Sequence, residues 1–197
     1  MKKKIQKGEI GYWKSRRKRE WIKTLLLFLT SFLMLITGML VAKHMNPDIS
    51  WSDSRKNLLT VAAVLGVLPA SRCMISAIMF TRACKHSCPR ELYERLKAFE
   101  EKLLLAFEIC LTAEKGTYPL HAVLCCDGEI LGLLDGDAAA AKQGEEHLKQ
   151  MLIKDGKKNV TVKLYTDSDA FIARVERAGE AGENGHALLE LLYQISL

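Results

Sequence analysis

An uncharged apolar run of 19 residues, Thr24–Ala42, constrains this chain more than any other feature of its sequence. At about 1.5 Å per residue, a helix of this length reaches about 28 Å, close to the hydrocarbon thickness of a bilayer. A second run, Leu58–Phe80, contains only one charged residue, Arg72, and one proline. We therefore predict a transmembrane hairpin over residues 21–82, with spans at 24–42 and 58–80 and a loop at 43–57.

The first span does not have the features of a cleaved signal peptide. The basic region before it is long, and its apolar stretch exceeds the usual length of about 7–15 residues. Leu40 and Ala42 make a poor small-x-small cleavage site. The sequence therefore predicts an uncleaved anchor.

The net charge of +6 is concentrated at one end of the chain. Residues 1–23 carry ten Lys or Arg against two Glu, a net of +8, whereas residues 103–197 carry nine against fifteen Asp or Glu, a net of −6. The positive-inside rule predicts a multi-pass protein of the cytoplasmic membrane, with both termini cytoplasmic and the loop 43–57 outside. The basic tail, residues 1–20, also suits anionic lipid headgroups. An acidic folded region disfavours nucleic acid as a partner.

Arg72 is the single charge within the predicted spans. An ionisable residue in a span is a candidate functional residue, and its role would be subunit pairing or ion passage. Nine residues separate it from Thr81, about 13 Å of helix, so snorkelling or anchoring of the helix end is the preferred interpretation, and subunit pairing or ion passage is the alternative.

The remaining residues, 83–197, predict a small cytoplasmic α+β domain with the order α-β-β-α-β-α and a further C-terminal helix. Apolar residues spaced by three and four predict one helix from Pro89 to Cys110. Asp127-Gly128 predicts a tight hairpin turn, and Asp137 predicts the cap of a helix over residues 138–154. A strand at residues 160–165 and a helix capped by Asp167 or Ser168 follow. The apolar end, ALLELLYQISL, must dock on the domain or bind a partner.

The six cysteines favour a reduced interior rather than a disulfide framework. They are Cys73, Cys84, Cys88, Cys110, Cys125 and Cys126. Several fall on apolar faces, and adjacent cysteines of a strand point to opposite sides. The sequence therefore predicts free, mostly buried thiols.

Acidic residues near the predicted hairpin are the candidates for catalysis. The order of elements loosely resembles the restriction-endonuclease-like core, in which acids on adjacent strands hold a metal at the phosphate. The candidates are Asp127, Glu129, Asp135 and His121. Ile130 and Leu131, rather than a lysine, follow Glu129. A turn role for Asp127 and a cap role for Asp137 are the preferred interpretation of those two acids.

Two further site hypotheses rest on short spacings. Cys84, His86 and Cys88 offer three soft ligands, but zinc usually takes two separated pairs, so we expect no metal and no cofactor. Cys125, His121 and Asp127 could form a nucleophilic triad only by proximity. No phosphate-binding glycine motif is present.

The stretches GYWKSRRKREWIKTLLLF, NLLTVAAVLGVLPASR, GEEHLKQML and NVTVKLYTD resemble a family of uncharacterised two-span bacterial membrane proteins. Some members carry the label O-linked N-acetylglucosamine transferase-like. That activity needs a donor-binding domain larger than about 110 residues can form, and no active-site residue carries over to this chain.

The sequence favours a membrane-anchored cytoplasmic module without catalytic activity that binds a protein partner or forms a homo-oligomer. The alternative is a membrane-anchored metal-dependent hydrolase or nuclease that uses the acids of residues 121–137.

Overall fold

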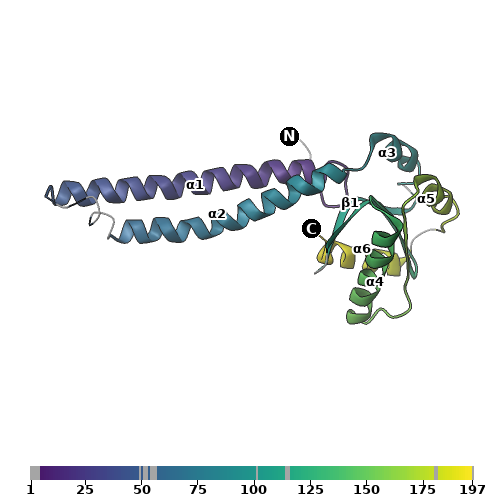
Figure 1. Cartoon of the computed structure of the whole chain (residues 1–197). Coiled ribbons are helices and arrows are strands. Elements are labelled where there is room, and N and C mark those ends of the chain that lie inside the picture. The colour runs from purple at the N-terminus through teal and green to yellow at the C-terminus, as the bar shows by residue number, and fades with distance from the viewer. Residues whose placement is uncertain are drawn as a thin grey trace. The chain divides into compact units, whose positions relative to one another are not determined.

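The structure is a computed structural model that describes residues 5–48, 50, 53, 57–100, 102–113, 116–179 and 182–196. The chain divides into two compact units (Figure 1). One is a helical hairpin, Lys14–Arg82, and the other is a domain that combines the residues up to Trp13 with Ala83–Leu197. The elements are α1 (Tyr12–Met45), α2 (Leu58–Ala83), the 3-10 helix η2 (Cys84–His86), α3 (Arg90–Lys97), β1 (Leu104–Ala113), β2 (Gly116–Cys126), β3 (Glu129–Leu134), α4 (Ala138–Lys154), β4 (Thr161–Tyr165), α5 (Ser168–Val175) and α6 (Glu183–Ile195).

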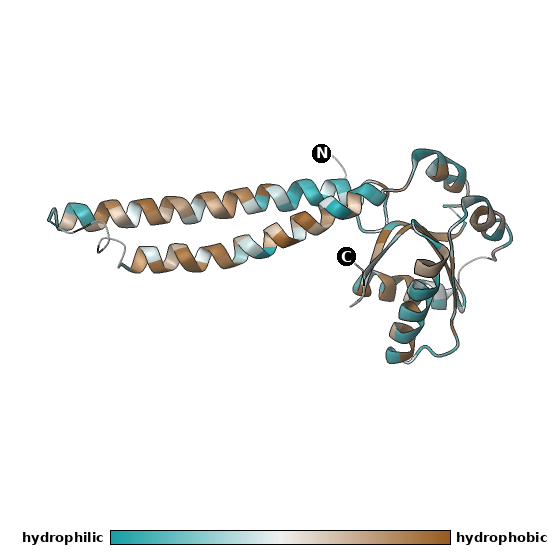
Figure 2. Cartoon of the chain, viewed as in Figure 1, coloured by the Kyte–Doolittle hydropathy of each residue, from teal (hydrophilic) through white to brown (hydrophobic). Residues whose placement is uncertain are grey.

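Helices α1 and α2 are each long and apolar enough to cross a membrane (Figure 2). They pack against each other through small side chains that recur every seven residues. The buried positions are Thr24, Ser31 and Gly38 on α1 and Ala63, Ala70 and Ala77 on α2. Small residues let two helix backbones approach closely, which is how helices pair in the absence of water.

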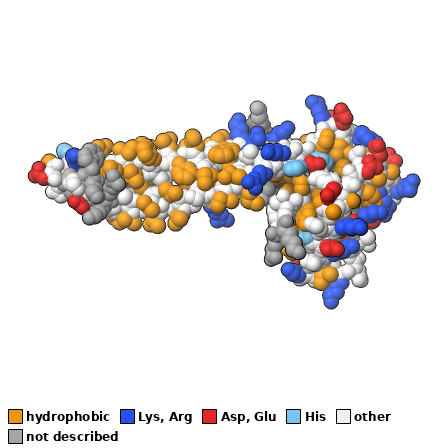
Figure 3. Space-filling model, in the orientation of Figure 1, with side chains coloured by type: hydrophobic (Ala, Val, Ile, Leu, Met, Phe, Trp, Pro, Cys, Tyr) orange, Lys and Arg blue, Asp and Glu red, His pale blue; other side chains and the backbone are white. Residues whose placement is uncertain are grey.

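The outward surface of the hairpin is apolar along most of its length (Figure 3). Every large hydrophobic side chain described as exposed, except Ile153 on α4, lies on α1 or α2. Pro69 lies inside α2, where it removes one backbone hydrogen bond, and α2 bends along its course (Figure 1).

The domain is a four-stranded sheet with helices on both faces. The strand order is β1-β2-β3-β4; the first three strands are antiparallel neighbours, and β4 runs parallel to β3. Helices α4 and α6 pack on one face, through side chains such as Leu148 and Leu192. Helices α3 and α5 pack on the other face, through Leu96 and Phe171. Each face has its own buried core, so the sheet is covered on both sides.

The prediction of one helix from Pro89 to Cys110 is wrong. Helix α3 ends at Lys97, and Leu104–Ala113 is strand β1, which makes the domain α-β-β-β-α-β-α-α. Residues Ala106–Leu111 are all buried, because β1 is covered on both faces. A strand buried on both faces has a continuous apolar run, and such a run cannot be told from a buried helix by periodicity.

Paired irregularities interrupt β1 and β2 at the same level. Phe107 pairs with Ala122 and Ile109 with Leu120, so Glu108 and His121 face each other outside the ladder. Glu108 has a φ of 54°, and the β2–β3 register shifts at His121. Side chains normally alternate between the two faces of a sheet, and this alternation changes phase at both residues, as expected of bulges. Glu108 is nevertheless buried, with 2% of its surface exposed.

Residues 5–13, here called the N-terminal strap, belong to the domain. The Phe107 backbone N–H donates to the Gly8 carbonyl (2.8 Å), and Lys7 Nζ donates to the carbonyl oxygens of Tyr193 and Ser196. Trp13, at the end of the strap, is fully buried. The predicted basic tail, residues 1–20, is therefore divided: part of it covers the outer edge of β1, and α1 begins at Tyr12.

Several local predictions are confirmed. Helix α4 covers the predicted residues, and the Asp137 carboxylate accepts from the Ala140 N–H (2.7 Å). Asp167 caps α5 in the same way. Gly128 of the β2–β3 turn has a positive φ of 77°, although Asp127 does not. The apolar C-terminal segment forms α6 and docks on the sheet.

Candidate functional site

The four residues predicted for catalysis lie at two separate places in the domain. Asp127 and Glu129 lie at the start of β3, whereas Asp135 follows its end. Six residues of extended chain separate these ends by about 20 Å. His121 lies with Asp135, so the structure brings two of the four candidates together.

Asp127 and Glu129 have structural partners. The Gly185 backbone N–H donates to the Asp127 carboxylate (3.2 Å), which fixes the start of α6 near the β2–β3 turn. The Arg174 guanidinium donates to Glu129 (2.7 Å) and ties α5 to β3. Both acids therefore connect a helix to the sheet.

Asp135 lies between two imidazoles. Its Oδ2 is 2.7 Å from His86 Nδ1 and 3.8 Å from His121 Nε2. His86 belongs to η2, directly after α2, and His121 belongs to the bulge of β2. The three side chains come from segments far apart in the sequence, so no local spacing indicated the cluster.

A cavity of about 450 Å³, here called the His121 pocket, opens beside this cluster. It is lined by the start of α3, by the middle of β2, by the end of β3 and by the β4–α5 turn, including His121, Asp135 and Ser168. The carboxyl ends of the parallel strands β3 and β4 meet here, which is the usual location of ligand sites in open α/β sheets. Its volume is within the range of small-molecule sites.

The electrostatics of the His121 pocket favour a neutral imidazole. Burial lowers the pKa of His121, and the charge of Asp135 opposes that shift only in part. A neutral histidine beside a carboxylate can accept or donate one proton or hydrogen bond. Arg95, on the pocket wall, is bound to Asp169 (2.8 Å), so its charge is already compensated.

Burial disfavours the reactive thiolate form of two cysteine candidates, Cys88 and Cys125. In the described part of the chain, no group of three or more His, Cys, Asp or Glu side chains is placed to hold a metal ion. Burial, with the nearby Glu108 charge, raises the pKa of Cys88 to about 12. Burial also raises the pKa of Cys125 to about 12, and its side chain belongs to the core beneath α4 and α6. All six cysteines are free thiols.

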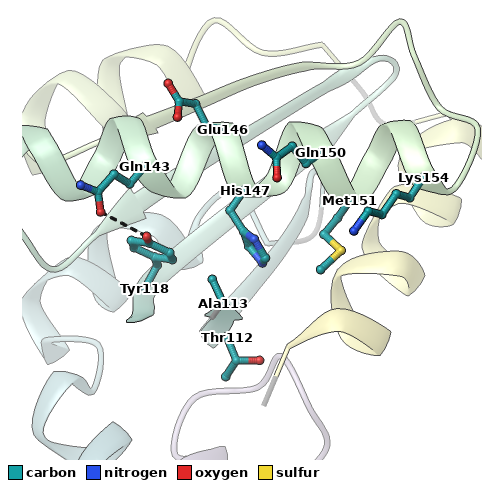
Figure 4. A pocket seen from close by; sticks show the side chains of 9 residues that line it. All are labelled: Thr112, Ala113, Tyr118, Gln143, Glu146, His147, Gln150, Met151 and Lys154. Carbon is teal, nitrogen blue, oxygen red and sulfur yellow. Dashed lines mark hydrogen bonds between the residues drawn. The ribbon is translucent and has the colours of Figure 1, made fainter. Parts of the chain in front are cut away.

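A second concavity, of about 580 Å³, lies along α4 (Figure 4). Gln143 and His147 project from α4 toward the end of β1 and the start of β2, and Lys154 lines the same groove near Met151. The Tyr118 hydroxyl donates to the Gln143 side chain (3.4 Å). This α4 groove presents amide, imidazole and charged groups with different hydrogen-bonding capacities, which suits a polar peptide surface.

The bulges also hold the segment through which the chain enters the hairpin. The Trp13 backbone N–H donates to the buried Glu108 carboxylate (3.1 Å), at the first turn of α1. A carboxylate is favourable at a helix N-terminus, where backbone N–H groups lack partners. At the same bulge pair, His121 contacts Asp135, which in turn contacts His86 of η2, the segment by which the chain leaves the hairpin. Sequence reasoning missed Glu108 because its neighbours Phe107 and Cys110 fit the apolar spacing of a helix, in which Glu108 would lie off the apolar face.

Comparison of the chain with protein-family models, with curated proteins and with solved structures finds no match. The function of the protein is therefore inferred from its own residues.

Proposed function

We propose that this protein is an integral membrane protein in which α1 and α2 span the bilayer and hold the α+β domain on the cytoplasmic side, where the domain binds a protein partner or a second copy of itself. The observation that carries the proposal is the distribution of exposed apolar side chains. They gather on the two helices and leave the described surface of the domain almost free of them.

Burial on the helices supports insertion. In each helix only 11% of the most apolar 18-residue stretch is buried, so these are not core helices of a soluble fold. Soluble proteins rarely expose apolar patches larger than about 600 Å². A bilayer supplies the apolar surroundings that the hairpin lacks.

Cationic side chains support the orientation. Lys14, Arg16, Arg17, Lys18 and Arg19 occupy the first turns of α1. Trp21 Nε1 donates to Thr81 Oγ1 (3.2 Å), so the start of α1 and the end of α2 lie at the same end of the hairpin. Both connections to the domain leave from this basic end, which is expected to remain in the cytoplasm and to contact anionic headgroups.

The α4 groove supports the binding role. It is concave, it lies on a helix whose opposite face is fixed in the core, and its polar groups face outward (Figure 4). The apolar C-terminal segment no longer argues for a partner, because α6 is buried on the sheet.

Fractionation and topology mapping test the anchoring. The full chain should stay in the membrane pellet after alkaline carbonate extraction. A single cysteine placed in the loop 43–57 of a cysteine-free variant should react with an impermeant maleimide in intact cells, whereas one after Leu197 should not. Release by carbonate, or labelling of the C-terminus alone, would contradict the proposal.

Light scattering and crosslinking of the purified protein test the binding role. A Gln143→Ala and His147→Ala double variant should lose self-association or a defined partner, while Lys142→Ala should not, because Lys142 is on α4 but outside the groove. If both variants behave as the parent chain does, the groove is not the binding surface.

The second candidate function is hydrolysis in the His121 pocket, favoured by the contact between Asp135 and His121. The metal-dependent form of this hypothesis requires the four acidic and histidine candidates to meet, and they lie at two ends of β3. His121→Gln should then abolish a phosphodiesterase or esterase activity while leaving the thermal midpoint within about 3 °C of the parent value. Glu129→Gln should keep that activity.

A further inference from the structure

We propose that Arg72 forms a specific site for the phosphate of an anionic phospholipid at the cytoplasmic edge of the bilayer. The inference rests on the proposed membrane insertion of α1 and α2. It concerns the hairpin alone, and it assigns a ligand to the single charge within the predicted spans.

The pairing of α1 with α2 sets the depth of Arg72. A Cβ added at Gly66 would lie 2.6 Å from Ser31 Oγ, so these two residues are at one level. Asn57 Nδ2 donates to the Gly38 carbonyl (3.0 Å), which agrees with an antiparallel register. Arg72 lies six residues from Gly66 toward the basic end, which places it level with Leu25.

Leu25 is only two residues inside Lys23, the last charge before the apolar run of α1. Two residues of helix correspond to about 3 Å. Arg72 is therefore much closer to the polar boundary than its distance of about 13 Å from Thr81 implies. A guanidinium at this depth reaches headgroup oxygens while its methylene groups stay in the apolar layer.

Within the hairpin, no acid is placed to neutralise Arg72. The hairpin sequence contains three acidic residues, Glu20, Asp48 and Asp53. Glu20 is 5% exposed and is bound to Arg16 (3.3 Å) and Lys23 (3.1 Å). Asp48 and Asp53 lie in the loop between the helices, at the opposite end.

Arg72 is exposed on α2 beside outward apolar side chains such as Leu68 and Ile75. Its surroundings are thus those of a bound lipid: acyl chains along the apolar face and a phosphate at the guanidinium. Guanidinium and phosphate form two parallel charge-assisted hydrogen bonds, which a lysine cannot reproduce. Phosphatidylglycerol, whose headgroup carries no competing cation, is the probe of choice.

The test uses native mass spectrometry of the full chain, released from detergent micelles after incubation with equimolar phosphatidylglycerol and phosphatidylcholine. The parent chain should retain phosphatidylglycerol preferentially. Arg72→Leu should retain about fivefold less, since one basic residue near an anionic surface contributes about that factor. The phosphatidylglycerol retained by Arg72→Lys should lie between the values for the parent chain and for Arg72→Leu. Lys142→Leu removes the same charge from an exposed position on α4 of the domain, outside the hairpin, and should retain lipid as the parent chain does.

Carbonate extraction of each variant separates this inference from the proposed anchoring. If the parent chain is extracted, the anchoring itself fails. If all variants stay in the membrane but Arg72→Leu keeps its phosphatidylglycerol, or if the parent chain retains both lipids equally, the Arg72 site is refuted.

Discussion

Replacing Trp13 with alanine tests whether the N-terminal strap is part of the domain core. Trp13 is fully buried, and removal of a buried aromatic side chain costs about 3–5 kcal/mol. Its indole Nε1 is buried and has no described hydrogen-bond partner, so its loss recovers part of that cost. We therefore expect the lower end of the range, about 3 kcal/mol. The backbone N–H that donates to Glu108 is kept in the variant.

For a domain of this size, a loss of about 3 kcal/mol lowers the thermal midpoint by about 10–15 °C. Pulse proteolysis of the full chain in detergent micelles, across a temperature series, measures that midpoint for the domain. Trp13→Phe keeps most of the apolar area and removes the unpaired donor, so it should cost about 1 kcal/mol or less.

Trp21→Ala is the matched control. Trp21 is 46% exposed and belongs to the hairpin, so its removal should leave the midpoint of the domain within about 2 °C. If Trp13→Ala and Trp21→Ala shift the midpoint equally, or if neither does, the strap is not part of the core and the argument from burial fails.

Three further predictions concern thiols, pH and packing. Burial raises the pKa of Cys88 and Cys125 to about 12 and that of Cys110 to about 11, so iodoacetamide at pH 8 should label these thiols only after unfolding. Mass spectrometry measures the labelling, and rapid labelling of these thiols in the folded chain would contradict the prediction. Because burial lowers the pKa of His121 in the folded state, the unfolded state binds more protons below about pH 6.5. The free energy of unfolding should therefore fall as the pH drops from 7 to 5, and it should fall less in the His121→Gln variant. Denaturant titrations at several pH values measure this, and an equal dependence on pH in the two proteins would refute the reasoning, since His86 and Asp135 remain in both. A Cβ at Gly144 would lie 2.8 Å from Leu164 Cδ1, so Gly144→Ala should destabilise the domain by about 1–2 kcal/mol despite the better helix propensity of alanine. The control, Gly116→Ala, should leave the stability unchanged, because a Cβ there meets no atom within 4 Å. Equal thermal midpoints of the two variants would show that Leu164 moves freely.

Local chemistry made part of this fold predictable. The turn at Gly128 and the caps at Asp137 and Asp167 depend on residues within a few positions, so their sequence signals were sufficient. The apolar runs of α1 and α2 were equally clear, because an uninterrupted run of that length has few alternatives.

The features that sequence reasoning misses are those decided by distant partners. The residues of β1 resemble a helix because burial on both faces removes the alternation that identifies a strand. The spacing of Glu145 and Lys149 favours an ion pair along α4, but Glu145 accepts from the Leu164 N–H on β4 (2.8 Å). His86 meets Asp135 across 49 positions of sequence, a contact that no spacing rule predicts.

The N-terminal strap gives the domain an unusual order of synthesis. Its first piece, ending at Trp13, leaves the ribosome before either helix of the hairpin, and its sheet follows only after both helices. The strap therefore has no partner until the edge of β1 and the carboxylate of Glu108 are made, nearly a hundred residues later. If α1 and α2 span a bilayer as proposed, closure of the domain requires both ends of the hairpin to lie on the same side of that bilayer. A chain whose second helix failed to insert would carry strap and sheet on opposite sides, and it would present an uncovered strand edge to the quality-control machinery of the cell.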